Sequence, residues 1–199
     1  MFKISKIKYV LFLLVFITTS SCSDIIHDIN TSQEIKLIKL STNMGDITIE
    51  LYQDKAPETV ANFLKYTKEG KLNGTIFHRV IPNFMIQGGG HLPDMSQIAT
   101  FDPIINESNN NISNKKGTIA MARTSSPNSA TSQFFINLRD NEFLDRANAA
   151  DGYGYCVFGQ VTEGIEIVEQ IGIVATGNNA GHSDVPIENI VINSVDVIE

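Results

Sequence analysis

Basic residues are scarce in this sequence, and their shortage limits the partners that the protein can bind. The formal net charge is −7 at pH 7. Three of the 15 basic residues, Lys3, Lys6 and Lys8, lie in the first 21 positions, which hold no acidic residue. The rest of the chain therefore carries 12 basic and 22 acidic side chains. Because a surface this acidic repels a phosphate backbone, the composition argues against nucleic acid as a partner.

Tryptophan is absent, only two cysteines occur, and the sequence has no internal repeat. Cys156 lies in an apolar run with strand character and is interpreted as a buried free thiol, since Cys22 is far from it in sequence. The histidines lack the spacing of metal ligands, so neither a metal nor a cofactor is predicted; they are His27, His78, His91 and His182. A hydrophobic content of 42% is typical of one globular domain with a sizeable core.

The N-terminus has no hydrophobic run long enough to span a bilayer comfortably, because its apolar core covers only residues 9–17. Three lysines precede this core and small polar residues follow it, which is typical of a secretory signal over residues 1–21. Cys22 comes next and resembles the lipidated cysteine of bacterial lipoproteins. This resemblance implies a periplasmic protein held to a membrane only by a lipid on Cys22. The alternative is ordinary cleavage that releases a soluble protein. Residues 22–34 are interpreted as a tether.

Residues 35–199 predict a mainly β domain. Apolar and alternating runs predict eight strands, at residues 35–40, 45–51, 76–81, 84–86, 117–123, 133–138, 155–161 and 190–198. Helical spacing predicts one helix from Pro57 to Gly70 and a second over residues 165–171. We therefore expect a closed β-barrel of about eight strands with the two helices covering its ends, because closure removes unpaired edges. Residues 91–116 read as a long loop of the kind that often has a function.

Residues 76–90 carry an arginine in an unusual place. Arg79 sits within an apolar, β-branched run, where a buried guanidinium is costly unless it is hydrogen-bonded or faces a cleft. It is therefore either a structural ion-pair partner or a site residue. Strand alternation places His78 on the opposite face from Arg79.

The run Phe77–Gly89 resembles the signature of the cyclophilin-type peptidyl-prolyl isomerases, and the resemblance is strongest to the bacterial branch of that family. Three further blocks match in order, at residues 121–123, 132–136 and 143–145. The resemblance extends over residues 35–199. It implies a mainly β, cyclophilin-like fold: a closed eight-stranded antiparallel β-barrel capped by two α-helices, with a shallow proline-binding groove on its outside.

The resemblance also implies a role for each matching residue. Arg79 is implied as the catalytic residue. The residues implied around the substrate are Phe84, Met85, Gln87, Ala122, Arg123, Gln133, Phe135, Phe143, Leu144 and Tyr155. Of the pair Phe134 and Phe135, which alternate on one strand, the first is expected in the core and the second in the groove. Phe143 and Tyr155 stand where many eukaryotic members carry tryptophan and histidine.

This chemistry suits an arginine. Isomerising an X-Pro bond breaks no covalent bond, and its barrier of ~18–20 kcal/mol is the resonance of the amide. Twisting gives the proline nitrogen a lone pair, to which Arg79 can donate without a protonation step. Together with the signal-like N-terminus, the resemblance predicts a monomeric isomerase that assists the folding of proline-containing, unfolded or partly folded proteins outside the cytoplasm. The alternative is a module of the same fold that binds proline segments with negligible turnover.

Overall fold

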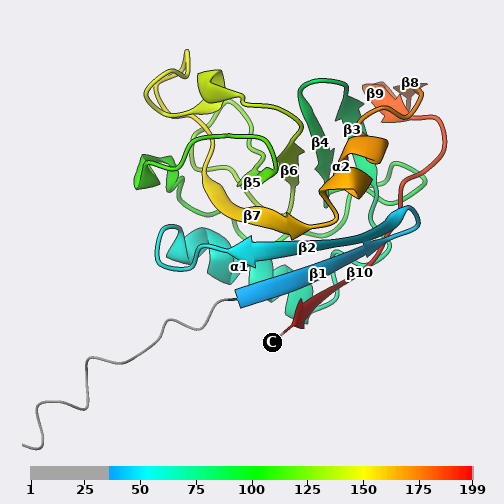
Figure 1. Cartoon of the computed structure of the whole chain (residues 1–199), viewed down its shortest axis with the longest axis horizontal. Coiled ribbons are helices and arrows are strands. Elements are labelled where there is room, and N and C mark those ends of the chain that lie inside the picture. The colour runs from blue at the N-terminus through cyan, green and yellow to red at the C-terminus, as the bar shows by residue number, and fades with distance from the viewer. Residues whose placement is uncertain (1–35, 199) are drawn as a thin grey trace, which may run out of the picture. The chain divides into compact units, whose positions relative to one another are not determined.

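The computed structural model describes residues 36–198 (Figure 1). Its strands are β1 (Lys36–Thr42), β2 (Gly45–Leu51), β3 (Phe77–Ile81), β4 (Met85–Gly88), β5 (Thr118–Met121), β6 (Phe134–Asn137), β7 (Val157–Glu163), β8 (Thr176–Asn179), β9 (His182–Pro186) and β10 (Ile192–Ile198). Its α-helices are α1 (Pro57–Lys68) and α2 (Ile165–Ile171), and two 3-10 turns cover Ser108–Asn110 and Glu142–Leu144. The predicted signal and tether, residues 1–34, lie outside the described residues.

Eight strands form one antiparallel sheet in the order β10-β1-β2-β7-β5-β6-β4-β3. All eight correspond to the strands predicted from the sequence. The predicted closure of the barrel is not confirmed. The sheet is curled, but its end strands β3 and β10 share no ladder; the segments that precede them meet at an isolated bridge between Ile76 and Val191. The hydrogen bonds beside this bridge include one from the Phe77 N–H to the Ile190 carbonyl, 2.9 Å long.

Both predicted helices are present, and local sequence explains their ends. Pro57 occupies the first turn of α1, where its missing N–H is not needed, and Glu58 complements the positive end of the helix dipole. The backbone reverses after α1 at Gly70, which has a φ of 64°. α2 starts after Gly164, where the backbone φ is 80°, and ends at Gly172. α1 packs against β10 and α2 against β2, so both helices cover the sheet.

The concave side of the sheet encloses the main core. Its centre is aromatic: Phe63 of α1 packs edge-on against Phe134 at 5.6 Å between ring centroids and lies 5.3 Å from Phe158. Aliphatic side chains from β1 and β2 complete it, among them Ile38 and Ile49, both fully buried. A buried side chain of this size contributes ~1.5–3 kcal/mol relative to its exposed state. The core therefore fixes the strands whose outer faces carry the site.

Side chains hold the long loop over residues 91–116 in place. The carboxylate of Glu107 accepts hydrogen bonds from the Thr59 N–H at 2.8 Å and the Thr59 hydroxyl at 2.7 Å, which caps the N-terminus of α1. The Asn110 amide donates to the Val157 carbonyl at 2.8 Å, at the start of β7. This loop is therefore an ordered part of the domain that links α1 to the sheet.

The hairpin of β8 and β9 was not predicted from the sequence. Its strands form a separate two-stranded sheet, and β9 packs against β3. In Figure 1 the hairpin lies beside β3 at the end of the sheet. No helix within residues 36–198 is both long and apolar enough to cross a membrane.

Candidate active site

A pocket of about 180 Å³ opens on the outer, convex face of the sheet. Its lining comes from strands β3, β4 and β6, from the segment after β5, and from the residues between β6 and β7. The lining residues are Arg79, Phe84, Met85, Gln87, Ala122, Arg123, Phe135, Leu144 and Tyr155. All nine were predicted as site residues. The structure therefore brings together residues that are up to 76 positions apart in the sequence.

The floor of the pocket is a small apolar cluster, separate from the main core. It contains Met85, Phe135 and Leu144, with Phe84 and Tyr155 packed at its margin. Strand alternation in β6 accounts for the separation, because neighbouring side chains point to opposite faces. Phe134 is fully buried in the main core, whereas Phe135 lines the pocket. The predicted division between these two phenylalanines matches their positions.

Arg79 lies at the pocket, whereas the neighbouring His78 is buried on the other face of β3; the strand is bulged between Phe77 and Arg79. The side chain of Arg79 is 44% exposed at the pocket, and its Nε lies 3.8 Å from Oδ2 of Asp184 on β9. The guanidinium therefore escapes the cost of burial and also has an ion-pair partner. His78 is buried on the other face, where its Nδ1 has no hydrogen-bond partner.

Burial lowers the pKa of the His78 imidazole to about 4, and the nearby His91 adds to the effect. The His78 and His91 rings lie 4.3 Å apart, and His91 lies 5.1 Å from His182 on β9. Sequence spacing had given no sign that these three side chains meet. Within residues 36–198, no group of three histidine, cysteine or acidic side chains has the geometry to hold a metal ion.

Gln87 and Gln133 act as a pair. The Gln87 amide donates to the Gln133 side-chain oxygen at 2.8 Å, which fixes the Gln87 side chain at the pocket wall. Gln133 itself is not among the lining residues; it packs over Gly90, where a Cβ would lie 2.5 Å from Gln133 Cγ. The glycine thus leaves room for the glutamine that orients Gln87.

Phe143 lies at the rim of the pocket and does not line it. Its ring stacks on Phe84 with 5.7 Å between centroids and an angle of 26°, and half of the residue is exposed. The predicted contact with a bound segment is therefore restricted to the edge of the site.

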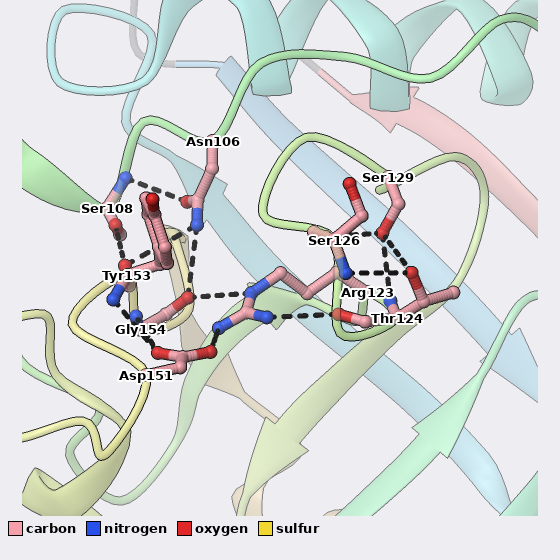
Figure 2. Close-up of polar contacts among 9 residues, drawn as sticks. All are labelled: Asn106, Ser108, Arg123, Thr124, Ser126, Ser129, Asp151, Tyr153 and Gly154. Atoms are coloured by element: carbon pink, nitrogen blue, oxygen red, sulfur yellow. Dashed lines mark hydrogen bonds and ion pairs between the residues drawn. The ribbon is translucent and has the colours of Figure 1, made fainter.

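Arg123 lies in a network of polar contacts with neighbouring loops (Figure 2). Its side chain is only 3% exposed. Its Nε donates to the Gly154 carbonyl at 2.9 Å, Nη1 donates to the Thr124 carbonyl at 3.0 Å, and Nη2 donates to Asp151. The guanidinium also lies 4.5 Å from the centre of the Tyr155 ring. The planar guanidinium thus connects the loop of Thr124 with the loop of Asp151 and Gly154, and it packs on Tyr155 in the pocket wall.

Asp151 is a residue of this network that sequence reasoning missed. Its Oδ1 accepts hydrogen bonds from the Tyr153 N–H at 2.9 Å and the Gly154 N–H at 3.2 Å. These bonds and the Arg123 guanidinium lower the pKa of Asp151 to about 2. The only local signal is the Asp151-Gly152 pair, which is typical of a turn and does not identify Arg123 as the partner.

Tyr155 connects the network to the floor. Its ring meets Phe135 edge-on at 5.7 Å, so the guanidinium, Tyr155 and Phe135 form a continuous contact from the loops to the pocket. The arrangement offers an apolar floor for one ring-sized group, a cationic donor on one side and a fixed amide beside it. It has neither a nucleophile nor an acid–base pair at its centre, so it suits a reaction in which no covalent bond changes.

Comparisons with known proteins agree with this geometry. Residues 37–197 match the family model described as "Cyclophilin type peptidyl-prolyl cis-trans isomerase/CLD". The chain is 55% identical over 164 residues to peptidyl-prolyl cis-trans isomerase B of Escherichia coli, covering 82% of this chain and all of that one. It is 51% identical over 162 residues to peptidyl-prolyl cis-trans isomerase cyp18 of Streptomyces antibioticus, covering 81% and 98% of the two chains.

A solved structure is also similar. The crystal structure of a cyclophilin type peptidyl-prolyl cis-trans isomerase of Cryptosporidium parvum, in the presence of the dipeptide ala-pro, superposes with a TM-score of 0.64 at 26% identity. The match covers 82% of this chain and 99% of that chain. The curled eight-stranded sheet is therefore the fold of that protein too.

Protonation of His78 should make the folded domain less stable in acid. The unfolded histidine titrates near 6.5 and the folded one near 4, so between these values the unfolded state binds more protons. The contribution of neutral His78 to the free energy of unfolding is therefore fully present above pH 6.5. It is lost as the pH drops toward 4, by about 3 kcal/mol for a pKa shift of this size. Urea unfolding of the wild type and His78→Gln at pH 7.5, 6, 5 and 4.5 tests this. The variant should show the shallower decline; parallel declines would contradict the role of His78.

Arg123→Lys should destabilise the domain although it keeps the charge. A lysine cannot serve the Gly154 carbonyl, the Thr124 carbonyl and Asp151 together, and losing two such bonds costs about 1–3 kcal/mol. The matched control is Arg139→Lys, since Arg139 donates through Nε to a single acceptor within residues 36–198, Asn141 at 3.2 Å. Urea unfolding at pH 7 should show a clearly larger loss for Arg123→Lys. Equal losses would show that the network does not hold the loops.

Proposed function

The chain belongs to the cyclophilin-type peptidyl-prolyl cis-trans isomerase family, and from this premise we propose that it isomerises X-Pro bonds in unfolded or partly folded proteins outside the cytoplasm. In this proposal it assists their folding. The observation that carries the activity is the placement of Arg79 beside an apolar floor of Met85, Phe135 and Leu144 in a single pocket.

The floor holds the proline ring. Phe84, Met85, Phe135 and Leu144 present apolar surface of the size of one ring, so the proline is held while the preceding carbonyl rotates. Burying a ring in this way gives little selectivity between planar and twisted amides by itself. The rate rises only through contacts that are stronger in the twisted state than in either planar state.

Arg79 supplies that difference. In the twisted amide the proline nitrogen becomes pyramidal and can accept a hydrogen bond, which the planar amide nitrogen cannot. A charged donor contributes ~1.5–3 kcal/mol to such a bond, which corresponds to about ten- to a hundred-fold in rate. Gln87, fixed by Gln133, is placed to bind the backbone of the same segment and to keep the proline in register with the guanidinium.

The location is proposed from the N-terminal sequence. The family model starts at residue 37, so the signal-like residues 1–21 and Cys22 lie outside it. Three lysines, a nine-residue apolar core and a cysteine after small polar residues support export followed by lipidation of Cys22. One lipid chain gives only marginal membrane binding, whereas a lipoprotein anchor carries more than one and holds the domain at the membrane. We propose a periplasmic, membrane-anchored isomerase.

Arg79→Ala should lower kcat/KM by at least ten-fold on an Ala-Pro peptide and leave Tm nearly unchanged, because the side chain is half exposed. A protease-coupled assay measures the rate and a thermal melt measures Tm. Lys39→Ala is the control, since Lys39 is also ion-paired on the surface but lies on β1. Wild-type protein that binds the peptide without turnover would favour a binding module instead. A large drop in Tm for Arg79→Ala would make Arg79 a structural residue.

Cys22→Ala should abolish membrane attachment. Expressed in a bacterium, the wild type should incorporate labelled fatty acid and fractionate with membranes, whereas the variant should do neither. Cys156→Ala serves as the matched control, because that thiol is buried in the domain and should leave labelling unchanged. A soluble, unlabelled wild type with another mature N-terminus would overturn the lipoprotein proposal.

A further inference from the structure

The hairpin of β8 and β9 lies against β3, the strand that carries Arg79. β3 is an end strand of the eight-stranded sheet, so one of its sides has no ladder partner in that sheet. The hairpin covers this side, as Figure 1 shows. The strand that holds the catalytic arginine is therefore supported on one side by β4 and on the other by β9 and, at Phe77, by the segment before β10.

Two contacts fix β9 in this position. Val185 is 2% exposed and packs in a small apolar cluster with Ile76, the residue directly before β3, and with Met95. His182 contacts His91, whose ring in turn contacts His78 on the buried face of β3. These contacts lie on both sides of Asp184 in the sequence, so Asp184 has little freedom to move away from β3.

Asp184 itself adopts a conformation that only a few residue types tolerate. Its φ is 61°, in the left-handed region, where aspartate and asparagine are strongly enriched among residues with a side chain. Its Oδ2 lies 3.8 Å from the Nε of Arg79. Within residues 36–198, Asp184 is the only side chain that pairs with the Arg79 guanidinium.

The direction of this contact matters for catalysis. A guanidinium donates from Nε on one edge and from its two terminal nitrogens on the others. Because the carboxylate faces Nε, the terminal nitrogens remain available to the pocket. An arginine side chain has several rotatable bonds, and a partner at Nε reduces the number of orientations that the donors can take.

We propose that Asp184 is a positioning residue: it holds the Arg79 guanidinium by its Nε edge, so that the terminal N–H groups point at the proline nitrogen. The hairpin β8–β9 holds Asp184 beside β3. This inference rests on the proposed function, since it assigns Asp184 a part in the same reaction. It also gives a role to a hairpin that contributes no residue to the pocket lining.

The test is Asp184→Asn, which keeps the side-chain size and a residue type that tolerates the left-handed backbone. We expect kcat to fall two- to five-fold, which is about 0.4–1 kcal/mol, with KM and Tm nearly unchanged. Exchange measurements by NMR on an Ala-Pro peptide separate kcat from KM. The matched control is Asp46→Asn: Asp46 forms a similar surface ion pair with Lys39, at 3.7 Å, but is remote from Arg79 in the sheet order. It should leave kcat unchanged.

A second measurement follows the orientation of the arginine directly. The sequence contains four arginines, so the Nε–H signals of the protein are few and Arg79→Lys identifies the one of interest. Nitrogen-15 relaxation should show lower order for the Arg79 Nε–H in Asp184→Asn than in the wild type. Val185→Ala, which loosens the docking of the hairpin without changing a charge, should lower the same order parameter and kcat in parallel.

The results distinguish failure of the proposed isomerase activity from failure of the positioning role of Asp184. If the wild type shows no isomerase activity, the proposed function fails. If the wild type is active and Arg79→Ala is not, but Asp184→Asn keeps full kcat, then Asp184 does not position the arginine. A rise in kcat would also overturn the proposal, since it would make the carboxylate a competitor for the donors. A loss of kcat that matches a loss of folded protein would reduce Asp184 to a structural residue.

Discussion

The alternation of side chains along a β-strand is the constraint on which the rest of this molecule depends. A curled sheet has one face that must be buried and one that meets solvent, and neighbouring residues necessarily point to different faces. Phe134 and Phe135 on β6 follow this rule. On β3 a bulge between Phe77 and Arg79 interrupts it, so that Phe77 lies in the core while Arg79 reaches the pocket. The core thereby holds each pocket residue through the backbone of its neighbour. A shift of one residue in the register of β6 would exchange core and pocket residues together.

A second constraint is the number of donors on Arg123. One guanidinium binds two carbonyls and one carboxylate from three places in the chain and also contacts the Tyr155 ring. These acceptors lie on two loops, one between β5 and β6 and one between β6 and β7. Their order therefore depends on a buried cation whose charge is balanced by Asp151, and the wall of the pocket depends on both.

Secondary structure that depends on a local repeating pattern could be predicted from the sequence. Contacts between residues that are distant in the sequence could not. Periodicity located the eight strands of the sheet and both helices, and the motif around Arg79 together with the further matching blocks located the pocket residues. The hairpin at residues 176–186 was not predicted, because β8 is polar and mostly exposed and therefore has no alternating apolar pattern. Contacts such as Arg79 with Asp184, or His91 with His182, join residues about a hundred positions apart, and no spacing rule connects them. Closure of the barrel was inferred from the need to hide edges, but a single bridge and a hairpin protect the end strands here.

The pairing of β1 with β10 has a consequence for how this domain comes into being. β1 lies between β2 and β10, and its register with β10 runs from Leu37 with Ile198 to Thr42 with Ile192. During synthesis β1 therefore has one unpaired edge until β10 has also been made. Contacts that span a whole chain are slow to form, because the intervening loop must close first. The sheet of a protein proposed to help other chains fold is therefore itself incomplete, and prone to aberrant strand pairing, until β10 has been synthesised.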